Sequence, residues 1–375
     1  VGSLNVRVTA TDTAGASAAQ DFTVTVNNTN DGPVASATIA DQSINEDAGF
    51  SFAVPASSFA DVDVGDSLTL SATLADGSPL PAWLSFNPAT QTFSGTPLND
   101  DVGAINIRVT ATDTSGASAT QDFQVTVNNT NDAPVITSSG AASFAENAAG
   151  TVYTAAATDV DAGATLTYSI SGADAALFNI DATTGVVTFK SSPNYEAPGD
   201  AGGNNVYDIT VGASDGTVTT TKDVAISVTN INEGPVFTSA TTASFAETTS
   251  GAAYTAAATD PDAGAVLTYS ISGADAALFD IDPATGAVTF KSAPNYEAPG
   301  ATGANNVYDI NVTASDGSLS STKAVAITVT NVNEAPTITS AATANFAENG
   351  SGTVYSASAT DPDAGATLTY SLTGA

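Results

Sequence analysis

Acidic and amide side chains recur at fixed positions along this chain, and they are the residues whose spacing could do chemistry. A lone glutamate is followed about 14 residues later by an Asp-x-Asp pair, and each stretch ends in a short Asn-rich acidic segment. The lone glutamates are Glu46, Glu146, Glu247 and Glu348, and the pairs are Asp61 and Asp63, Asp159 and Asp161, Asp260 and Asp262, and Asp361 and Asp363. Single aspartates near the last predicted hairpin of each stretch are Asp12, Asp113, Asp215 and Asp316.

Such a set favours oxygen coordination of a hard cation. Calcium takes about 6–8 oxygen atoms, so several chain segments must meet to supply them. Carboxylates packed together without a cation repel one another. The alternative is that these residues only form turns, because Asp and Asn cap turns well. That alternative suits an isolated Asp215-Gly216, whereas a set that recurs in one order favours cation binding.

The net charge allows two interpretations. There are 39 acidic residues against 6 basic ones, for a formal net charge of −33. This acidity either keeps the protein soluble by self-repulsion or forms carboxylate clusters that bind cations. It argues against nucleic acid as a partner and against docking on anionic membranes. Apolar residues make up 42% of the chain, enough for packed cores, so the chain is not a disordered acidic tail.

Missing residue types narrow the chemistry further. The sequence contains no Cys, no His and no Met. Disulfides, thiolate and imidazole ligands and histidine acid–base catalysis are therefore excluded. The remaining metal chemistry uses oxygen ligands, which suits calcium or magnesium. Bound ions would also stabilise a chain that has no disulfides.

The ends of the chain and its apolar runs bear on how it relates to a longer protein and to a membrane. No run of about 18 or more apolar residues occurs, so we expect no membrane insertion within this chain. There is also no signal peptide and no initiator Met. Both ends lie inside the repeating pattern, so we expect a fragment of a larger protein.

Four prolines mark an internal repeat. They are Pro33, Pro134, Pro235 and Pro336, and the spacings 134−33, 235−134 and 336−235 are each 101 residues. Each proline follows a polar segment, at 28–31, 129–132, 230–233 and 331–334. Proline fixes its own φ and disfavours helix in the residue before it, so these segments are predicted to be extended linkers.

The prolines divide the chain into three complete repeats and two partial ones. We predict the C-terminal part of a repeat at 1–32, complete repeats at 33–133, 134–234 and 235–335, and the N-terminal part of a repeat at 336–375. The complete ones are called the first, second and third repeats below. The second and third are close copies. The first has a different middle, with Trp83-Leu84-Ser85-Phe86 and Phe93-Ser94-Gly95-Thr96-Pro97.

The hydrophobic period within a repeat is two residues. One face of each predicted strand carries the apolar residues, as in Leu4, Val6 and Val8, in Phe22, Val24 and Val26, and in Val224, Ile226 and Val228. Thr and Val dominate these runs, and Gly, Asn, Asp and Ser interrupt them. Several short strands in each repeat predict an antiparallel sandwich.

Local signals complete the prediction of the fold. Asp215-Gly216 between two alternating runs predicts a hairpin turn. Trp83, Phe86, Phe178 and Phe189 are predicted to be core residues, since burial is the usual role of aromatic side chains.

The order of motifs in residues 134–375 resembles that of cadherin repeats. The motifs of the second repeat are Ala145-Glu146-Asn147, Asp159-Val160-Asp161-Ala162-Gly163, Leu166-Thr167-Tyr168-Ser169-Ile170, Phe178-Asn179-Ile180-Asp181, Asn194-Tyr195-Glu196, Ala213-Ser214-Asp215-Gly216 and Asn230-Ile231-Asn232-Glu233-Gly234-Pro235. Residues 1–133 resemble the related dystroglycan-type cadherin-like repeat through Ser94-Gly95-Thr96-Pro97-Leu98-Asn99-Asp100-Asp101-Val102-Gly103. The near-identical copies, the Ala, Thr, Gly and Asp bias and the missing Cys look like giant bacterial surface adhesins.

The resemblance implies an all-β, elongated tandem array of Ig-like Greek-key β-sandwiches with calcium between repeats. At the join of the first and second repeats it implies Glu46, Asn99, Asp101, Asn129, Asn131 and Asp132 with Asp159, Asp161 and Asp215. At the next join it implies Glu146, Asn194, Glu196, Asn230, Asn232 and Glu233 with Asp260, Asp262 and Asp316. After the third repeat it implies Glu247, Asn295, Glu297, Asn331, Asn333 and Glu334 with Asp361 and Asp363, and before the first repeat Asn28, Asn30 and Asp31 with Asp61, Asp63 and Asp113.

The sequence departs from the cadherin pattern in three places. The family's linker has one more residue before its proline, whereas Glu233 is followed by Gly234-Pro235. Asn194 stands where the family has Asp, and no Asn follows Gly163. These departures bear on the number of ions at each join.

Three classes of function follow from these expectations. The favoured one is calcium-dependent adhesion at the cell surface, in which calcium stiffens neighbouring repeats into an extracellular, rod-like support. The second is a binding module whose repeats contact identical repeats or a polysaccharide. An enzyme is not expected, because every carboxylate pair recurs once per repeat and Ser has neither a His partner nor a Gly-x-Ser-x-Gly elbow.

Overall fold

The computed structural model describes residues 2–63 and 65–374, in which almost all ordered elements are β-strands. The chain divides into two compact units. Unit 1 contains residues 1–140, 153–188 and 209–224, and unit 2 contains residues 141–152, 189–208 and 225–375. The boundary therefore passes through the second repeat. None of the helices in the described residues is long and apolar enough to cross a membrane.

The first repeat, in unit 1, is a sandwich of two sheets. One sheet has four strands in the order β4-β11-β10-β7, the other has three in the order β5-β9-β8, and β3 pairs with β6. The elements are β3 (Val34–Ala35), β4 (Gln42–Asn45), β5 (Phe50–Ala53), β6 (Phe59–Ala60), β7 (Thr69–Leu74), β8 (Leu84–Asn87), β9 (Thr92–Gly95), the 3₁₀ helix η1 (Asn99–Asp101), β10 (Gly103–Thr112) and β11 (Ser118–Asn128).

Alternation along the strands places the core of the first repeat between its two sheets. Ile107 and Val109 on β10 are fully buried, and so is Phe93 on β9. Trp83 and Phe86 are partly buried against this core, as predicted from their aromatic character. The ring centroids of Phe86 and Phe93 lie 4.6 Å apart, so the aromatic residues that distinguish this repeat fill its interior.

The segment before the first repeat is a two-stranded sheet. It consists of β1 (Gly2–Thr11) and β2 (Ser17–Val26), which pair antiparallel. Its predicted apolar face is present, because Leu4, Val6 and Val8 alternate with polar residues. In the described residues no second sheet packs against that face, so Leu4 and Phe22 stay exposed.

The second repeat has a four-stranded sheet in the order β13-β20-β19-β16 and a three-stranded sheet in the order β14-β18-β17. Its elements are β12 (Val135–Ile136), β13 (Ala141–Ala145), β14 (Thr151–Thr154), β15 (Ala157–Thr158), β16 (Thr167–Ser171), η2 (Ala175–Leu177), β17 (Phe178–Ile180), β18 (Val186–Phe189), β19 (Val206–Ser214) and β20 (Thr219–Thr229). The predicted turn at Asp215-Gly216 joins β19 to β20, and Gly216 adopts φ 98° there. Val224, Ile226 and Val228 are buried, as their period of two predicts.

The third repeat, in unit 2, repeats this plan with the orders β22-β29-β28-β25 and β23-β27-β26. Its core contains Tyr308, Ile310, Phe279 and Ile327, all nearly or fully inaccessible. Its elements are β21 (Val236–Phe237), β22 (Thr242–Ala246), β23 (Ala252–Thr255), β24 (Ala258–Thr259), β25 (Thr268–Ser272), η3 (Ala276–Leu278), β26 (Phe279–Ile281), β27 (Ala287–Phe290), β28 (Val307–Ser315) and β29 (Ser320–Thr330). The partial repeat that follows contains the antiparallel pair β30 (Thr337–Ile338) and β31 (Ala359–Thr360).

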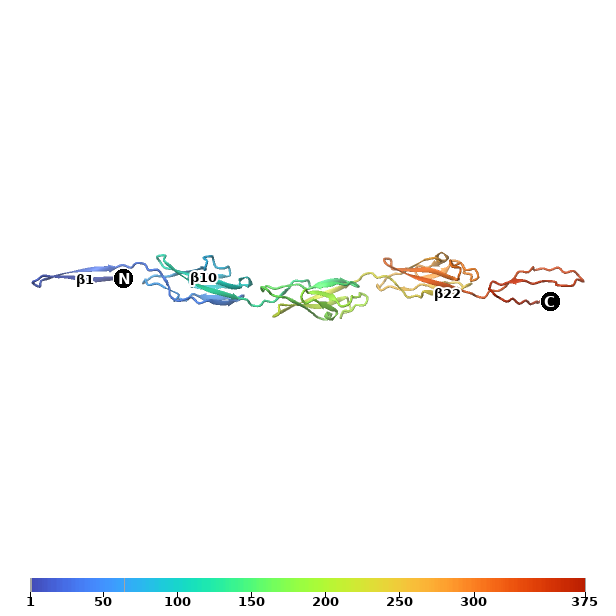
Figure 1. Cartoon of the computed structure of the whole chain (residues 1–375), viewed down its shortest axis with the longest axis horizontal. Coiled ribbons are helices and arrows are strands. Elements are labelled where there is room, and N and C mark those ends of the chain that lie inside the picture. The colour runs from blue at the N-terminus through green and yellow to red at the C-terminus, as the bar shows by residue number, and fades with distance from the viewer. Residues whose placement is uncertain (1, 64, 375) are drawn as a thin grey trace. The chain divides into compact units, whose positions relative to one another are not determined.

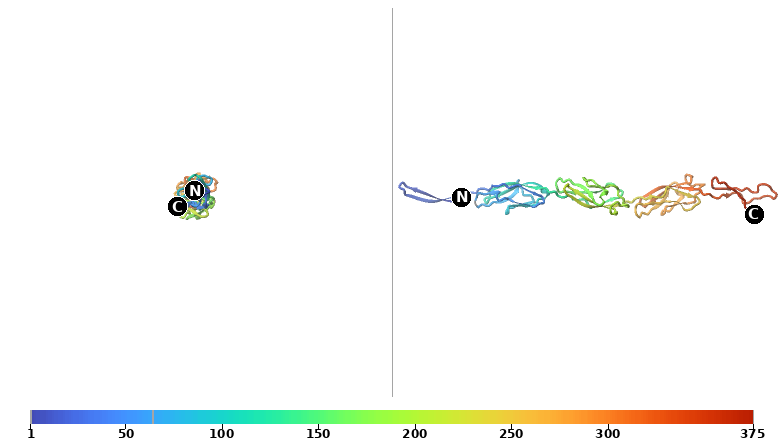
Figure 2. Two further views of the ribbon diagram at one scale, coloured as in Figure 1. Left: turned by 90° about the vertical axis from the view of Figure 1, so that its left-hand side faces the viewer. Right: turned by 90° about the horizontal axis from the view of Figure 1, so that it is seen from below.

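The long strands of each sandwich run along the length of that sandwich, which leaves its loops at its two ends (Figures 1 and 2). Strand β10 shows this in the first repeat, and the shorter β22, which pairs with the long strand β29, is labelled in the third (Figure 1). The all-β class and the Ig-like sandwiches predicted from the sequence are confirmed.

Candidate functional site

Two strand pairings bring the acidic residues of each join together. The first is a parallel pairing at the C-terminal end of a repeat. Strand β13 runs parallel to β20, with Ala145 opposite Thr229, so the residues that follow both strands emerge at the same end. Glu146 and the linker at 230–233 are those residues. The same pairing precedes Glu46 and Glu247.

The second pairing is antiparallel and lies at the start of a repeat. Val135, just after the linker proline, is opposite Thr158 at the end of β15. Asp159 follows Thr158 directly, so the Asp-x-Asp pair returns to the linker. The pairs β3–β6, β21–β24 and β30–β31 do the same for the other aspartate pairs.

The linkers are hydrogen-bonded to the second aspartate of each pair. At the join of the second and third repeats, Asn230 Nδ2 donates to Asp262 Oδ1 at 2.8 Å, and the Glu233 N–H donates to Oδ2 at 2.7 Å. The contacts recur as Asn28 and Asp31 with Asp63, as Asn129 and Asp132 with Asp161, and as Glu334 with Asp363.

The third linker residue binds the hairpin aspartate. Asn232 Nδ2 donates to Asp316 Oδ2 at 2.8 Å, and this amide lowers the pKa of the Asp316 carboxyl, with help from backbone N–H groups of its own turn. Asn30 with Asp113 and Asn131 with Asp215 form the same contact. These aspartates are therefore held ionised beside the linker.

In three of the four pairs, the first aspartate presents a buried oxygen that has no hydrogen-bond partner among the described residues. Asp260 Oδ1 accepts the Asp262 N–H at 3.0 Å, which fixes the carboxylate, while its Oδ2 is buried and accepts no hydrogen bond in the described part of the chain. Asp61 and Asp159 show the same two features. Asp361 also accepts the Asp363 N–H.

Three of the lone glutamates, Glu46, Glu146 and Glu247, are buried carboxylates that accept backbone N–H groups, whereas Glu348 in the partial repeat is exposed. Glu146 is 2% exposed. Its Oε1 accepts the Ile231 N–H at 2.8 Å, and its Oε2 accepts the Tyr195 N–H at 2.7 Å. Glu247 is bonded in the same way by Val332 and Tyr296. The ion pairs of Arg7 with Asp21, Arg108 with Asp122 and Lys291 with Asp280 do not involve these glutamates.

Carboxylates gather in groups whose oxygens lie within 4.8 Å of one another. These groups are Glu46 with Asp132 and Asp161, Glu146 with Glu196 and Glu233, Glu247 with Glu297 and Glu334, and Asp61 with Asp63 and Asp66. The pKa of Glu196 is raised by burial and by the neighbouring charges of Glu146 and Glu233. Burial and the carboxylates around it raise the pKa of Glu334 as well.

These groups fit a hard divalent cation. Buried oxygens of Glu46, Glu196, Glu233, Glu297 and Glu334 have no hydrogen-bond donor in the described residues. A buried carboxylate oxygen without a donor is costly, and close carboxylates repel one another. A cation that accepts only oxygen ligands would relieve both costs.

Some residues implied by the resemblance are hydrogen-bonded within their own loops, and others donate to carboxylates or carbonyls at the joins. Asn194 Oδ1 accepts the Ala197 N–H of its own loop at 2.7 Å, and Asn295 makes the equivalent bond to Ala298. Asp101 accepts the Leu98 N–H and so closes η1. Asn99 Nδ2 donates to Asp132 Oδ2, Asn331 Nδ2 reaches Glu297 Oε1 at 3.3 Å, and Asn333 Nδ2 donates to the Glu334 carbonyl.

Sequence reasoning missed two polar residues at the joins. Asn147 Nδ2 donates to Glu233 Oε1 at 2.7 Å. Asp47 and Thr248 stand at the corresponding places in the first and third repeats, and Asn recurs only as Asn349 in the partial repeat, so the signal was weak. Asp66 joins the group of Asp61 and Asp63, and it has no counterpart in the other repeats.

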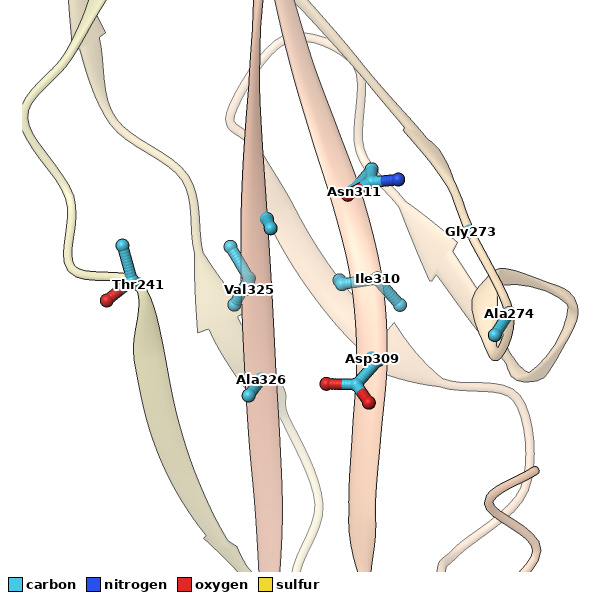
Figure 3. A pocket seen from close by; sticks show the side chains of 9 residues that line it. Thr241, Gly273, Ala274, Asp309, Ile310, Asn311, Val325 and Ala326 are labelled. Carbon is cyan, nitrogen blue, oxygen red and sulfur yellow. The ribbon is translucent and has the colours of Figure 1, made fainter. Parts of the chain in front are cut away.

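A pocket elsewhere offers less chemistry. On the third repeat a hollow of about 290 Å³ lies over β28 and β29, and Asp309 is the one carboxylate among its labelled lining residues (Figure 3). The hollow forms because the side chains that line it are small, as a comparison with the second repeat shows. In the second repeat, Thr210 donates to Asp223, and the residues 101 positions later are Asn311 and Ala324. The joins are therefore the stronger candidate sites.

Comparisons with known proteins agree with this fold. The He_PIG family model, described as "Putative Ig domain", matches residues 32–128. A search of curated proteins found no match.

Solved cadherin structures are similar to the chain as a whole. The protocadherin gammaB7 EC3-6 cis-dimer structure has a TM-score of 0.55 and 19% identity, covering 88% of this chain and 85% of that chain. Protocadherin Gamma B2 extracellular cadherin domains 1-5 have 0.53 and 20%, covering 97% and 72%. The Protocadherin GammaB4 extracellular domain has 0.54 and 23%, covering 97% and 60%. The repeats of this chain thus have the fold of cadherin ectodomain repeats.

Proposed function

We propose that this chain is a calcium-binding segment of an extracellular adhesion protein, in which cations at the joins hold neighbouring repeats together. The observation that carries the proposal is the buried, donor-free carboxylate oxygen at each join after the first, second and third repeats. When bound, calcium supplies positive charge and several oxygen coordination positions to such groups.

The ligands would come from both sides of a join. At the join of the second and third repeats they would be Glu146, Glu196 and Glu233 with Asp260, Asp262 and Asp316 and the linker residues Asn230 and Asn232. Calcium is favoured over magnesium because magnesium demands a near-ideal octahedron and keeps several waters. The extracellular setting is supported by the cadherin fold and matches the weak calcium affinity, about 10⁻⁴–10⁻³ M, of extracellular modules.

The test is a calcium titration of the whole chain by calorimetry, repeated with magnesium. We expect calcium binding in the unmodified chain, with fewer ions bound after Asp260→Asn or Asp262→Asn. Asp282→Asn is the matched control, because the Asp282 carboxylate accepts the N–H groups of Ala284 and Thr285 within its own turn. Equal binding by all four chains, or no calcium heat at all, would refute the proposal.

Self-association is a second candidate function. One of the similar structures is described as a cis-dimer, which concerns that protein and supports only a test here. Sedimentation of the chain with and without calcium decides it: a dimer that forms with calcium supports binding between identical repeats, and a monomer at all concentrations rejects it.

A further inference from the structure

The join between the first and second repeats differs from the two joins that follow. We infer that Asp101 is not a cation ligand there, although it stands where Glu196 and Glu297 stand in the next repeats. The third carboxylate of this site comes instead from Asp161, in the second repeat. The inference rests on the proposed function and specifies which residues serve it.

Asp101 is occupied within its own loop. Its Oδ2 accepts the Leu98 N–H at 3.0 Å, and its own N–H donates to the Leu98 carbonyl at 2.8 Å. These two bonds close the 3₁₀ helix η1, which the second and third repeats lack at this position. Aspartate is also one methylene shorter than glutamate. Glu196, in contrast, has a buried Oε2 that accepts no hydrogen bond among the described residues.

The altered loop leaves Glu46 with an unused oxygen. Glu146 has a backbone donor on each of its oxygens. Glu46 Oε1 accepts the Thr130 N–H at 2.8 Å, whereas Oε2 is buried and has no partner in the described residues. The Glu46 side chain is 2% exposed, so water does not replace the missing donor. A buried anionic oxygen without a donor requires a positive charge beside it.

Asp161 completes this group across the join. An oxygen of Asp161 lies within 4.8 Å of oxygens of Glu46 and Asp132. The linker holds Asp161 in place, since Asn129 Nδ2 and the Asp132 N–H each donate to it at 2.8 Å. In the next two joins the grouped carboxylates belong to the upstream repeat and its linker. The cation after the first repeat therefore contacts two repeats through one compact group.

The test compares two linkers in the same full-length chain. Hydrogen exchange read by mass spectrometry gives the calcium concentration at which the linker amides 129–132 and 230–233 become protected. The variants are Asp101→Asn, which keeps an oxygen for the Leu98 N–H, and Glu196→Gln as its matched counterpart. Asp161→Asn is the positive control: it shows whether protection of the linker amides 129–132 changes when an inferred cation ligand is removed. Protection of β10 amides shows that the first repeat remains folded.

We expect Asp101→Asn to shift the midpoint for residues 129–132 by less than about twofold, while Asp161→Asn raises it about tenfold or more. Glu196→Gln is expected to raise the midpoint for residues 230–233 by about tenfold. An Asp101→Asn shift as large as the Glu196→Gln shift overturns this inference and leaves the proposed function standing. If calcium protects neither linker in the unmodified chain, the proposed function itself fails.

Discussion

A buried carboxylate beside other carboxylates makes the state without cations sensitive to protons. Glu196 is the clearest case, since burial and the charges of Glu146 and Glu233 raise its pKa. A carboxyl whose pKa is higher in the folded protein opposes folding while it is ionised. That opposition disappears as the pH falls through the raised pKa.

We therefore expect the calcium-free chain to become more stable between about pH 7 and pH 5, before the ordinary aspartates begin to protonate. Thermal unfolding in a chelator at the two pH values measures this. Glu196→Gln should reduce the gain because the glutamine carries no charge at either pH. A calcium-free chain that loses stability steadily over this interval would contradict the assignment.

Residue types could be predicted from the sequence better than their partners. Glu146, Asp260 and Asp262 were marked by recurrence, and the structure brings their equivalents to the joins. The backbone N–H of Tyr195 and the amide of Asn147 carry no such mark, because any residue has an N–H and the first and third repeats have Asp47 and Thr248 in place of Asn147. Asp101 accepts a hydrogen bond within a 3₁₀ turn, and no hydrophobic pattern in the sequence predicts that turn.

At the scale of elements, the pairing of strands places the acidic residues at the joins, and the strand propensity of each segment does not predict that pairing. Strands such as β19 and β20 follow from alternation and from the Asp215-Gly216 turn. The two-residue strands β12 and β15 have no sequence period, and yet their pairing returns Asp159 to the linker. Likewise, the parallel pairing of β13 with β20 could not be read from either segment alone.

The turn between β26 and β27 lies close to the backbone before β24. This contact predicts that a side chain at the turn glycine destabilises the third repeat. Gly286 has φ +71°, and a Cβ there would lie 2.5 Å from the Ala256 carbonyl oxygen. Gly317 has φ +100° with nothing within 4 Å. Gly317→Ala should cost only the left-handed strain of about 1–2 kcal/mol, and Gly286→Ala about 1–3 kcal/mol more, through overpacking.

Calorimetric unfolding of the two variants with saturating calcium makes this comparison. The pair is matched, because both introduce one methyl group at a turn glycine of the third repeat. Equal losses of stability would show that the Ala256 carbonyl does not restrict the turn.

At the scale of the whole molecule, the proposed cations at the joins would control how freely neighbouring repeats move. In a linear array each repeat contacts only its neighbours, so a ligand bound at the joins acts on the entire chain. A chelator would remove the cations and leave the carboxylates at the joins to repel one another. The repeats would then be held less firmly, and we expect a looser chain with a smaller radius of gyration.

Small-angle scattering with calcium, with magnesium and with a chelator measures that change. Asp262→Asn in calcium should move the curve part of the way toward that of the chelated protein, because one join is affected. Identical radii of gyration in calcium and chelator would remove the proposed mechanical role while leaving calcium binding intact.

The division of each site between the end of one repeat and the start of the next has a genetic consequence. From the second repeat onward, the glutamates and aspartate pairs recur with the same 101-residue period as the linker prolines. Unequal crossover that deletes or duplicates one whole period therefore rebuilds a join from the same kinds of donors. Such an exchange changes the length of the protein without leaving an unmatched half-site, whereas a deletion of half a period would separate the donors from their acceptors.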